Sequence, residues 1–130
     1  MSQARDPAGR TVPQPVTMPP PNAVLLVLTS LPDDQSADRV AQALVDERLA
    51  ACVNVLGPCR SVYRWQGRVE RAQEVPLLIK TSQDRYQALE RRLRELHPYE
   101  LPEILACRPD GGLSDYADWV IRETRPARGR

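Results

Sequence analysis

The chain has 130 residues, of which 42% are hydrophobic, and a formal net charge of +1. This length predicts one domain with a core of its own, and the near balance of charges excludes a general electrostatic attraction to nucleic acid or to a membrane surface. The three cysteines show no close pairing and no apolar stretch resembles a signal segment, so we expect a cytoplasmic protein without a disulfide framework.

The first part of the chain is predicted to contain a tail, a strand and a helix. Residues 1–22 are expected to be a disordered tail, because they hold six of the 13 prolines and show no apolar periodicity. The apolar stretch 23–29 predicts a strand, since it is far shorter than the roughly 20 residues of a membrane helix. A break with a proline follows, in which Asp34 or Ser36 can cap a helix. Apolar residues then recur at helical spacing as far as Leu49.

The middle of the chain predicts a long hairpin. Residues 52–56 have strand character, and Gly57-Pro58 interrupts it as a bend. Residues 60–65 then alternate, which places Tyr63 and Trp65 on one face.

The hairpin turns and returns in the next 16 residues. Gln66-Gly67 is a turn signal, and the return strand extends from about residue 68 to residue 81. Pro76 has no N–H to donate, so we expect an edge or a bulge at that point.

The last third predicts two helices and a short strand. Ser82 is a candidate cap for a helix that ends before Pro98. Four apolar residues form its stripe: Tyr86, Leu89, Leu93 and Leu96. Residues 104–107 predict a strand with Cys107 in the core, and Ser114 is a candidate cap for the final helix.

This order of elements, β-α-β-β-α-β and then α, predicts an α+β fold: a ferredoxin-like sandwich with an extra C-terminal helix, over residues 23–124, followed by a short tail at 125–130. Two helices on one face of the sheet leave the other face bare, and a second copy of the chain is the natural cover. The overlong hairpin and the proline in its return strand also indicate strand addition between subunits.

Four motifs in this order resemble the CutA family. They are residues 50–54 with Cys52 and Asn54, residues 61–67, Glu74 with residues 78–81, and residues 97–103. The resemblance covers about residues 23–124, including 116–119 near the end. It implies a ferredoxin-like homotrimer similar to the PII signalling proteins, in which long hairpins form sheets between subunits. It also implies divalent-cation tolerance with copper binding, and no established enzymatic reaction.

The copper site that the resemblance implies uses a strand cysteine and two adjacent histidines. The matching positions here are Thr29, Leu96 and His97, so only the histidine is retained. One imidazole beside a hydroxyl and a leucine is not a soft copper site.

Two groups of residues remain candidates for function. A site for copper or another divalent metal can be formed by His97, Glu100, Glu103 and Cys59. The alternatives are that His97 caps the preceding helix, that the two glutamates pair with arginines, and that Cys52 is a small buried hydrophobe.

The second group is a cleft or interface formed by Tyr63, Trp65, Lys80, Tyr99 and Trp119. Lys80, the only lysine of the chain, would together with His97 suit a small anionic ligand. The alternative is a trimer interface of aromatic residues, with Trp119 in the packing face of the last helix.

The chain carries none of the common nucleophile, phosphate-loop or dinucleotide motifs, so we do not expect an enzyme. The function predicted from the sequence is divalent-cation tolerance of the CutA type. The alternative is a PII-like trimeric signalling or scaffold protein whose intersubunit cleft binds a small anion or a partner protein.

Overall fold

The computed structural model describes residues 5, 7–11 and 23–127. Within them, the strands are β1 (Val24–Leu31), β2 (Cys52–Val55), β3 (Cys59–Trp65), β4 (Arg68–Ser82) and β5 (Leu105–Cys107). The α-helices are α1 (Asp34–Asp46), α2 (Tyr86–Leu96) and α3 (Ser114–Glu123), and a 3-10 helix, Gln83–Arg85, precedes α2. The α+β class and the predicted order of elements are confirmed, with the interrupted strand of residues 52–65 divided into β2 and β3.

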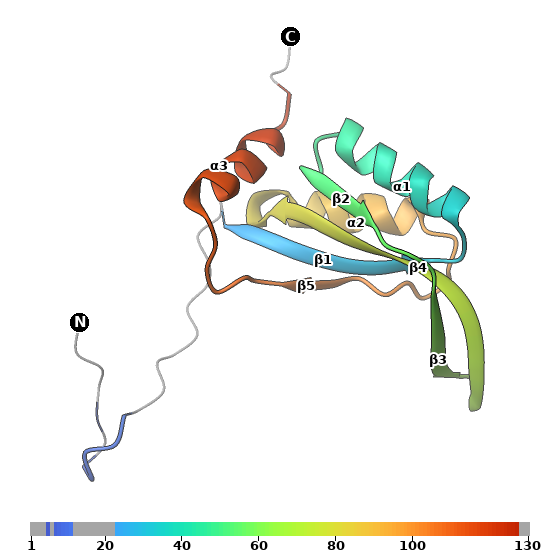
Figure 1. Ribbon diagram of the computed structural model, residues 1–130, viewed down its shortest axis with the longest axis horizontal. Helices are drawn as coiled ribbons and strands as arrows, with labels where there is room; N and C mark the ends of the chain where they lie inside the picture. The colour runs from blue at the N-terminus through green and yellow to red at the C-terminus, as the bar shows by residue number, and fades with distance from the viewer. Residues whose placement is uncertain (1–4, 6, 12–22, 128–130) are drawn as a thin grey trace.

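The strands form one antiparallel sheet in which β4 is central. One edge of β4 pairs with β1, and its other edge pairs with β2 and then with β3. β5 pairs with the remaining edge of β1. Helices α1 and α2 lie on the same side of the sheet, and the hairpin of β3 with the first half of β4 bends away from it (Figure 1).

The core lies between the sheet and these two helices. Successive side chains of a strand face opposite sides, and the ones that β1 and β4 bury include Leu25, Val27, Leu31, Val75, Leu77 and Ile79. The helices contribute residues three or four positions apart, namely Val40, Leu44, Leu89 and Leu93. The apolar stripes predicted for both helices therefore do face the core.

The opposite face of the sheet exposes apolar side chains. Leu28 is 37% exposed, and Leu105, its partner in the register of β1 and β5, is 58% exposed. Cys107 was expected in the core, but it is exposed. The reason is that β5 is a short edge strand and Cys107 shares this open face with its partner Leu26.

The hairpin tip has the predicted turn. Gln66 and Gly67 both have positive φ, 50° and 79°, which is typical of the tight turns that match the twist of a two-stranded ribbon. From this turn β3 and β4 pair without interruption as far as Cys59 and Glu74.

The N-cap of α1 differs from both residues that the sequence suggested. Asp33 occupies it, with Oδ1 accepting a hydrogen bond from the backbone N–H of Ser36 (2.7 Å). The helix also ends at Asp46 rather than near Leu49. Arg48 takes a left-handed φ of 58°, and the chain reverses there so that Leu49 can pack into the core.

Ser82 does not cap the second helix with its side chain. It is buried, and its Oγ accepts a hydrogen bond from Thr124 Oγ1 (3.1 Å). This contact joins the end of β4 to the residue that follows α3, a pairing 42 positions apart that local pattern does not reveal.

Pro76 lies inside the sheet rather than at its edge. It pairs with Ser30 of β1, and its carbonyl accepts a hydrogen bond from Leu56 N–H (2.9 Å) on the other side. A strand residue directs its N–H and C=O to the same side. The missing N–H of Pro76 therefore faces the interval between β2 and β3, where Gly57 and Pro58 interrupt the pairing.

The predicted tail of residues 1–22 lies mostly outside the described residues, as do the last three residues of the chain. In its described part, Arg5 and Thr11 form an isolated antiparallel bridge. The Arg5 guanidinium also donates a hydrogen bond to the carbonyl of Gly9 (2.7 Å).

Candidate functional site

The loop after α2 begins with His97, whose backbone ends the helix. Its N–H donates to Leu93 O (2.9 Å), and its backbone then turns extended, at φ −77° and ψ 131°, because Pro98 follows. The side chain is only 7% exposed and lies between Ser30 of β1 and Tyr99. His97 is therefore the C-cap of α2, as one alternative predicted. It caps the helix with its backbone rather than with a protonated side chain.

Both ring nitrogens of His97 have partners within the chain. Nδ1 accepts a hydrogen bond from the Tyr99 N–H (3.2 Å) and therefore carries no proton. Nε2 lies 2.9 Å from Ser30 O, to which it donates. Burial lowers the pKa of His97, against smaller opposing effects of the Ser30 carbonyl and Glu74. The ring is thus a neutral structural bridge.

Next to this bridge lies a groove with a volume of about 710 Å³. Its described lining comes from three strands and the loop: Ser30 of β1; Ser61, Val62, Tyr63 and Trp65 of β3; Glu74 of β4; and Pro98, Tyr99, Glu100, Leu101 and Glu103. Five residues that the sequence singled out are therefore brought together here. They are Tyr63, Trp65, Tyr99, Glu100 and Glu103.

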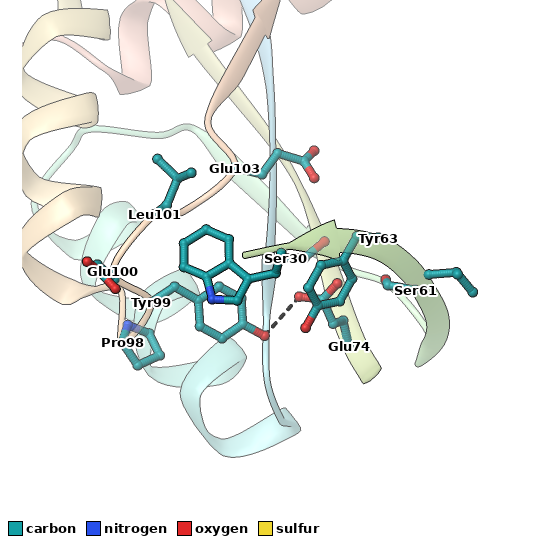
Figure 2. A pocket seen from close by; sticks show the side chains of 11 residues that line it. Ser30, Ser61, Tyr63, Glu74, Pro98, Tyr99, Glu100, Leu101 and Glu103 are labelled. Carbon is teal, nitrogen blue, oxygen red and sulfur yellow. Dashed lines mark hydrogen bonds between the residues drawn. The ribbon is translucent and has the colours of Figure 1, made fainter. Parts of the chain in front are cut away.

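Tyr99 ties the loop to the central strand. Its hydroxyl donates a hydrogen bond to Glu74 Oε2 (2.8 Å), as Figure 2 shows. Burial, and then the Glu74 carboxylate, raise the pKa of Tyr99 well above its usual value. The phenol therefore stays protonated and remains a donor throughout the physiological pH range. The Tyr99 ring also packs against the ring of His97, with the two ring centroids 4.8 Å apart.

The lining of the groove is acidic and aromatic. Glu74, Glu100 and Glu103 supply three carboxylates, and none of the described lining residues is basic. Neither Lys80 nor His97 is among them, so this groove of a single chain does not contain the two cations expected of an anion site between subunits. Lys80 instead donates a hydrogen bond to Asn54 Oδ1.

Lys80, Cys52 and Asn54 lie together on the open face of the sheet. Lys80 and Cys52 are direct partners in the register of β2 and β4, and Cys52 is half-buried. Lys80 lies four residues along β4 from Pro76, the strand partner of the groove residue Ser30. This separation is roughly 13 Å at the rise of a strand. Trp119 is also absent from the lining; its ring lies 5.6 Å from that of Tyr116 within α3.

The comparisons with known proteins agree with this architecture. The family model described as CutA1 divalent ion tolerance protein matches residues 25–123. The chain belongs to this family. It is 44% identical over 99 residues to the divalent-cation tolerance protein CutA of Thermus thermophilus, covering 76% of this chain and 96% of that one. It is 40% identical over 102 residues to CutA of Pyrococcus horikoshii, covering 78% and 99%.

Solved CutA structures have the same fold. The crystal structure of CutA from Xylella fastidiosa superposes with a TM-score of 0.76 at 45% identity, covering 78% of this chain and 98% of that one. A protein of Archaeoglobus fulgidus described as periplasmic CutA gives 0.76 at 28% identity, covering 78% and 99%. Within the described residues, no helix is both long and apolar enough to cross a bilayer.

The three positions of the copper site implied by the CutA resemblance do not fit a metal. Thr29 is 1% exposed in the core, Leu96 packs against the core, and both His97 nitrogens are used. Copper prefers imidazole and sulfur ligands, and no free one is present at these positions.

The second set of proposed ligands is not gathered within one chain either. Among residues 5, 7–11 and 23–127, no three His, Cys, Asp or Glu side chains form a group that could hold a metal ion. Cys59 is half-buried, with Sγ 3.7 Å from Ser61 Oγ. Glu100 and Glu103 do share the groove, whose described lining does not include His97.

Sequence analysis missed the role of Glu74 as the partner of Tyr99. Glu74 was noticed only as part of a motif, since the two residues are 25 positions apart. The available signal was the alternation of β4, which places Glu74 on the same face as Pro76 and hence beside Ser30.

Proposed function

We propose that this chain acts in divalent-cation tolerance as a cytoplasmic homotrimer of ferredoxin-like subunits, without catalysing a reaction. The observation that carries the proposal is the family match over residues 25–123, whose relatives share the name divalent-cation tolerance protein. The two halves β1-α1-β2 and β4-α2-β5, interleaved in the order β2-β4-β1-β5, support the ferredoxin-like description.

Exposed apolar surface supports the assembly. Val62 and Val69 lie on the same face of the projecting hairpin and are 55% and 60% exposed. Leu28 and Leu105 are exposed on the open face of the sheet. Exposed apolar side chains that lie together are typical of protein interfaces, and the other copies of the chain cover them in the proposed trimer.

Divalent ions, in this proposal, bind through the groove carboxylates Glu100 and Glu103 rather than through a cysteine and histidine site. Both carboxylates are exposed and line the same groove as Glu74. Oxygen ligands suit hard divalent cations, and the donors at Thr29, Leu96 and His97 do not suit copper.

Native mass spectrometry tests both parts of the proposal. The purified protein is measured at micromolar concentration, alone and with manganese, zinc or copper. We expect a trimer that takes up manganese or zinc, with uptake reduced in a Glu100→Gln, Glu103→Gln double variant. Glu95→Gln, on the exposed part of α2, is the matched control. A monomer overturns the assembly, and uptake that the double variant leaves unchanged overturns the ligand assignment.

A second candidate function is favoured by the size of the groove. A cavity of about 710 Å³ lies in the range of small-molecule sites, which agrees with a PII-like trimeric signalling or scaffold protein. The acidic lining then decides what class of ligand such a protein would take.

A further inference from the structure

The groove combines three aromatic rings with three carboxylates. Tyr63 and Trp65 come from β3, with 44% and 37% of their surface exposed, and Tyr99 comes from the loop. The hairpin and the loop after α2 are far apart in the sequence, and both contribute side chains to the lining of this groove (Figure 2). Aromatic faces attract cations through the negative potential of the ring, and the carboxylates add to that attraction.

The lining argues against an anionic ligand, and it offers more groups than a bound metal ion would use. An anion would meet three carboxylates and no basic residue among the described lining, so its binding would be opposed. A metal ion held by the proposed ligands Glu100 and Glu103 needs ligands at roughly 2 to 2.6 Å, and it would leave Glu74 and the three rings of this groove of about 710 Å³ unused. A larger organic cation can contact rings and carboxylates at once.

We propose that this groove binds a small organic cation with a guanidinium head, stacked on the aromatic rings and hydrogen-bonded to Glu74. A planar guanidinium both stacks on aromatic faces and donates charge-assisted hydrogen bonds to a carboxylate oxygen. The inference shares the groove with the proposed metal ligands but depends on neither metal binding nor catalysis.

The Tyr99 hydroxyl positions the carboxylate for this role. It donates to Glu74 Oε2 (2.8 Å) and so orients the carboxylate, while Oε1 accepts no hydrogen bond from the described part of the chain and can accept one from the ligand. Tyr99 is itself fixed by its N–H bond to the neutral ring of His97. These hydrogen bonds connect Ser30, His97, Tyr99 and Glu74 in series. They thus orient the Glu74 carboxylate before a ligand binds.

Isothermal titration calorimetry on the full chain, in its native assembly, tests the inference. The probe is n-butylguanidinium, and n-butylurea is the neutral analogue of nearly the same shape. We expect n-butylguanidinium to bind with a Kd of about 0.1 to 10 mM and n-butylurea to bind at least tenfold more weakly. Inorganic phosphate tests the anionic alternative and is expected to give no heat.

Two variants locate the site. Glu74→Gln keeps the shape and removes the charge, and we expect it to weaken n-butylguanidinium binding about tenfold or more. Trp65→Leu removes a ring and should weaken binding about twofold to fivefold, with manganese or zinc uptake unchanged. Glu95→Gln, which removes the same charge outside the groove, should have no effect. Thermal unfolding confirms that each variant is folded.

Each contrary result overturns the inference. These results are no binding of n-butylguanidinium at 20 mM, equal binding of n-butylurea, binding of phosphate in the groove, or the same loss in Glu95→Gln as in Glu74→Gln. If a neighbouring subunit fills the groove, n-butylguanidinium will not bind, and that result also overturns the inference. Because the titration measures neither subunit number nor metal uptake, it can fail while the proposed function holds.

Discussion

At the scale of single residues, polar groups in the core are the most informative feature. Thr29 and Thr81 are both buried on the helix-facing side of the sheet, in adjacent strands. Thr81 Oγ1 donates a hydrogen bond to Leu49 O (2.7 Å), whereas Thr29 Oγ1 has no partner among the described residues. A buried hydroxyl without a partner costs stability, so the two threonines should respond in opposite ways to the same substitution.

We predict that Thr29→Val increases the free energy of unfolding by about 1 kcal/mol, because it removes an unpartnered hydroxyl and keeps the branched shape. Thr81→Val, the matched control, should lower it by about 1 kcal/mol, because it leaves the Leu49 carbonyl without its donor. Urea denaturation at one protein concentration measures both. Destabilisation of the same size in both variants would contradict the argument.

His97 predicts a pH dependence of stability. Burial lowers its folded-state pKa below the ordinary value of 6.5, so the unfolded chain binds more protons in the interval between the two values. The stabilisation is complete above the unfolded pKa and is lost as the pH falls through the folded pKa.

We therefore expect the free energy of unfolding to fall between about pH 7.5 and pH 5.5, in urea denaturation series at fixed protein concentration. His97→Gln, which does not titrate, should flatten this part of the profile even though it lowers stability overall. An unchanged slope in His97→Gln would assign the effect to another group.

At the scale of elements, the hairpin depends on its turn. Gly67 has a φ of 79°, in the left-handed region that favours glycine, although a Cβ there would meet nothing within 4 Å. Gly57, in the bend between β2 and β3, also has open space around its Cα, without a positive φ. A comparison of alanine substitutions at the two glycines therefore measures the effect of backbone strain without a steric contact.

We predict that Gly67→Ala lowers the free energy of unfolding by about 1 kcal/mol. Gly57→Ala should be neutral or slightly stabilising, because alanine restricts the unfolded chain without strain in the folded one. Denaturation of the two variants, with amide hydrogen exchange across β3 and β4, measures the difference. Equal stability of the two variants would show that the turn tolerates a side chain.

At the scale of the whole molecule, the groove and the open face result from how elements are arranged. β4 is long enough to pair with β2 at one end and with β3 at the other, so one strand belongs to both the body and the hairpin. This continuity places Glu74 at the junction, opposite the loop after α2. The hairpin and the uncovered sheet face leave apolar surface exposed, which the proposed trimer covers.

The sequence by itself determined the order of the elements, the two amphipathic helices, the Gln66-Gly67 turn and the CutA resemblance. These follow from local periodicity, turn chemistry and motif spacing, which need no knowledge of distant contacts. It also singled out Tyr63, Trp65 and Tyr99, because alternation and the two prolines of the 97–103 loop restrict where they can point.

Only the tertiary structure decided what these residues do. The separation of Lys80 from the groove, the role of Glu74, the neutral bridge at His97 and the exposure of Cys107 all depend on strand register and on contacts across 25 to 81 positions. Local pattern cannot reveal them, since a shift of one residue in register turns every side chain to the other face. The same register leaves Lys80 outside the groove and places Glu74 in its lining.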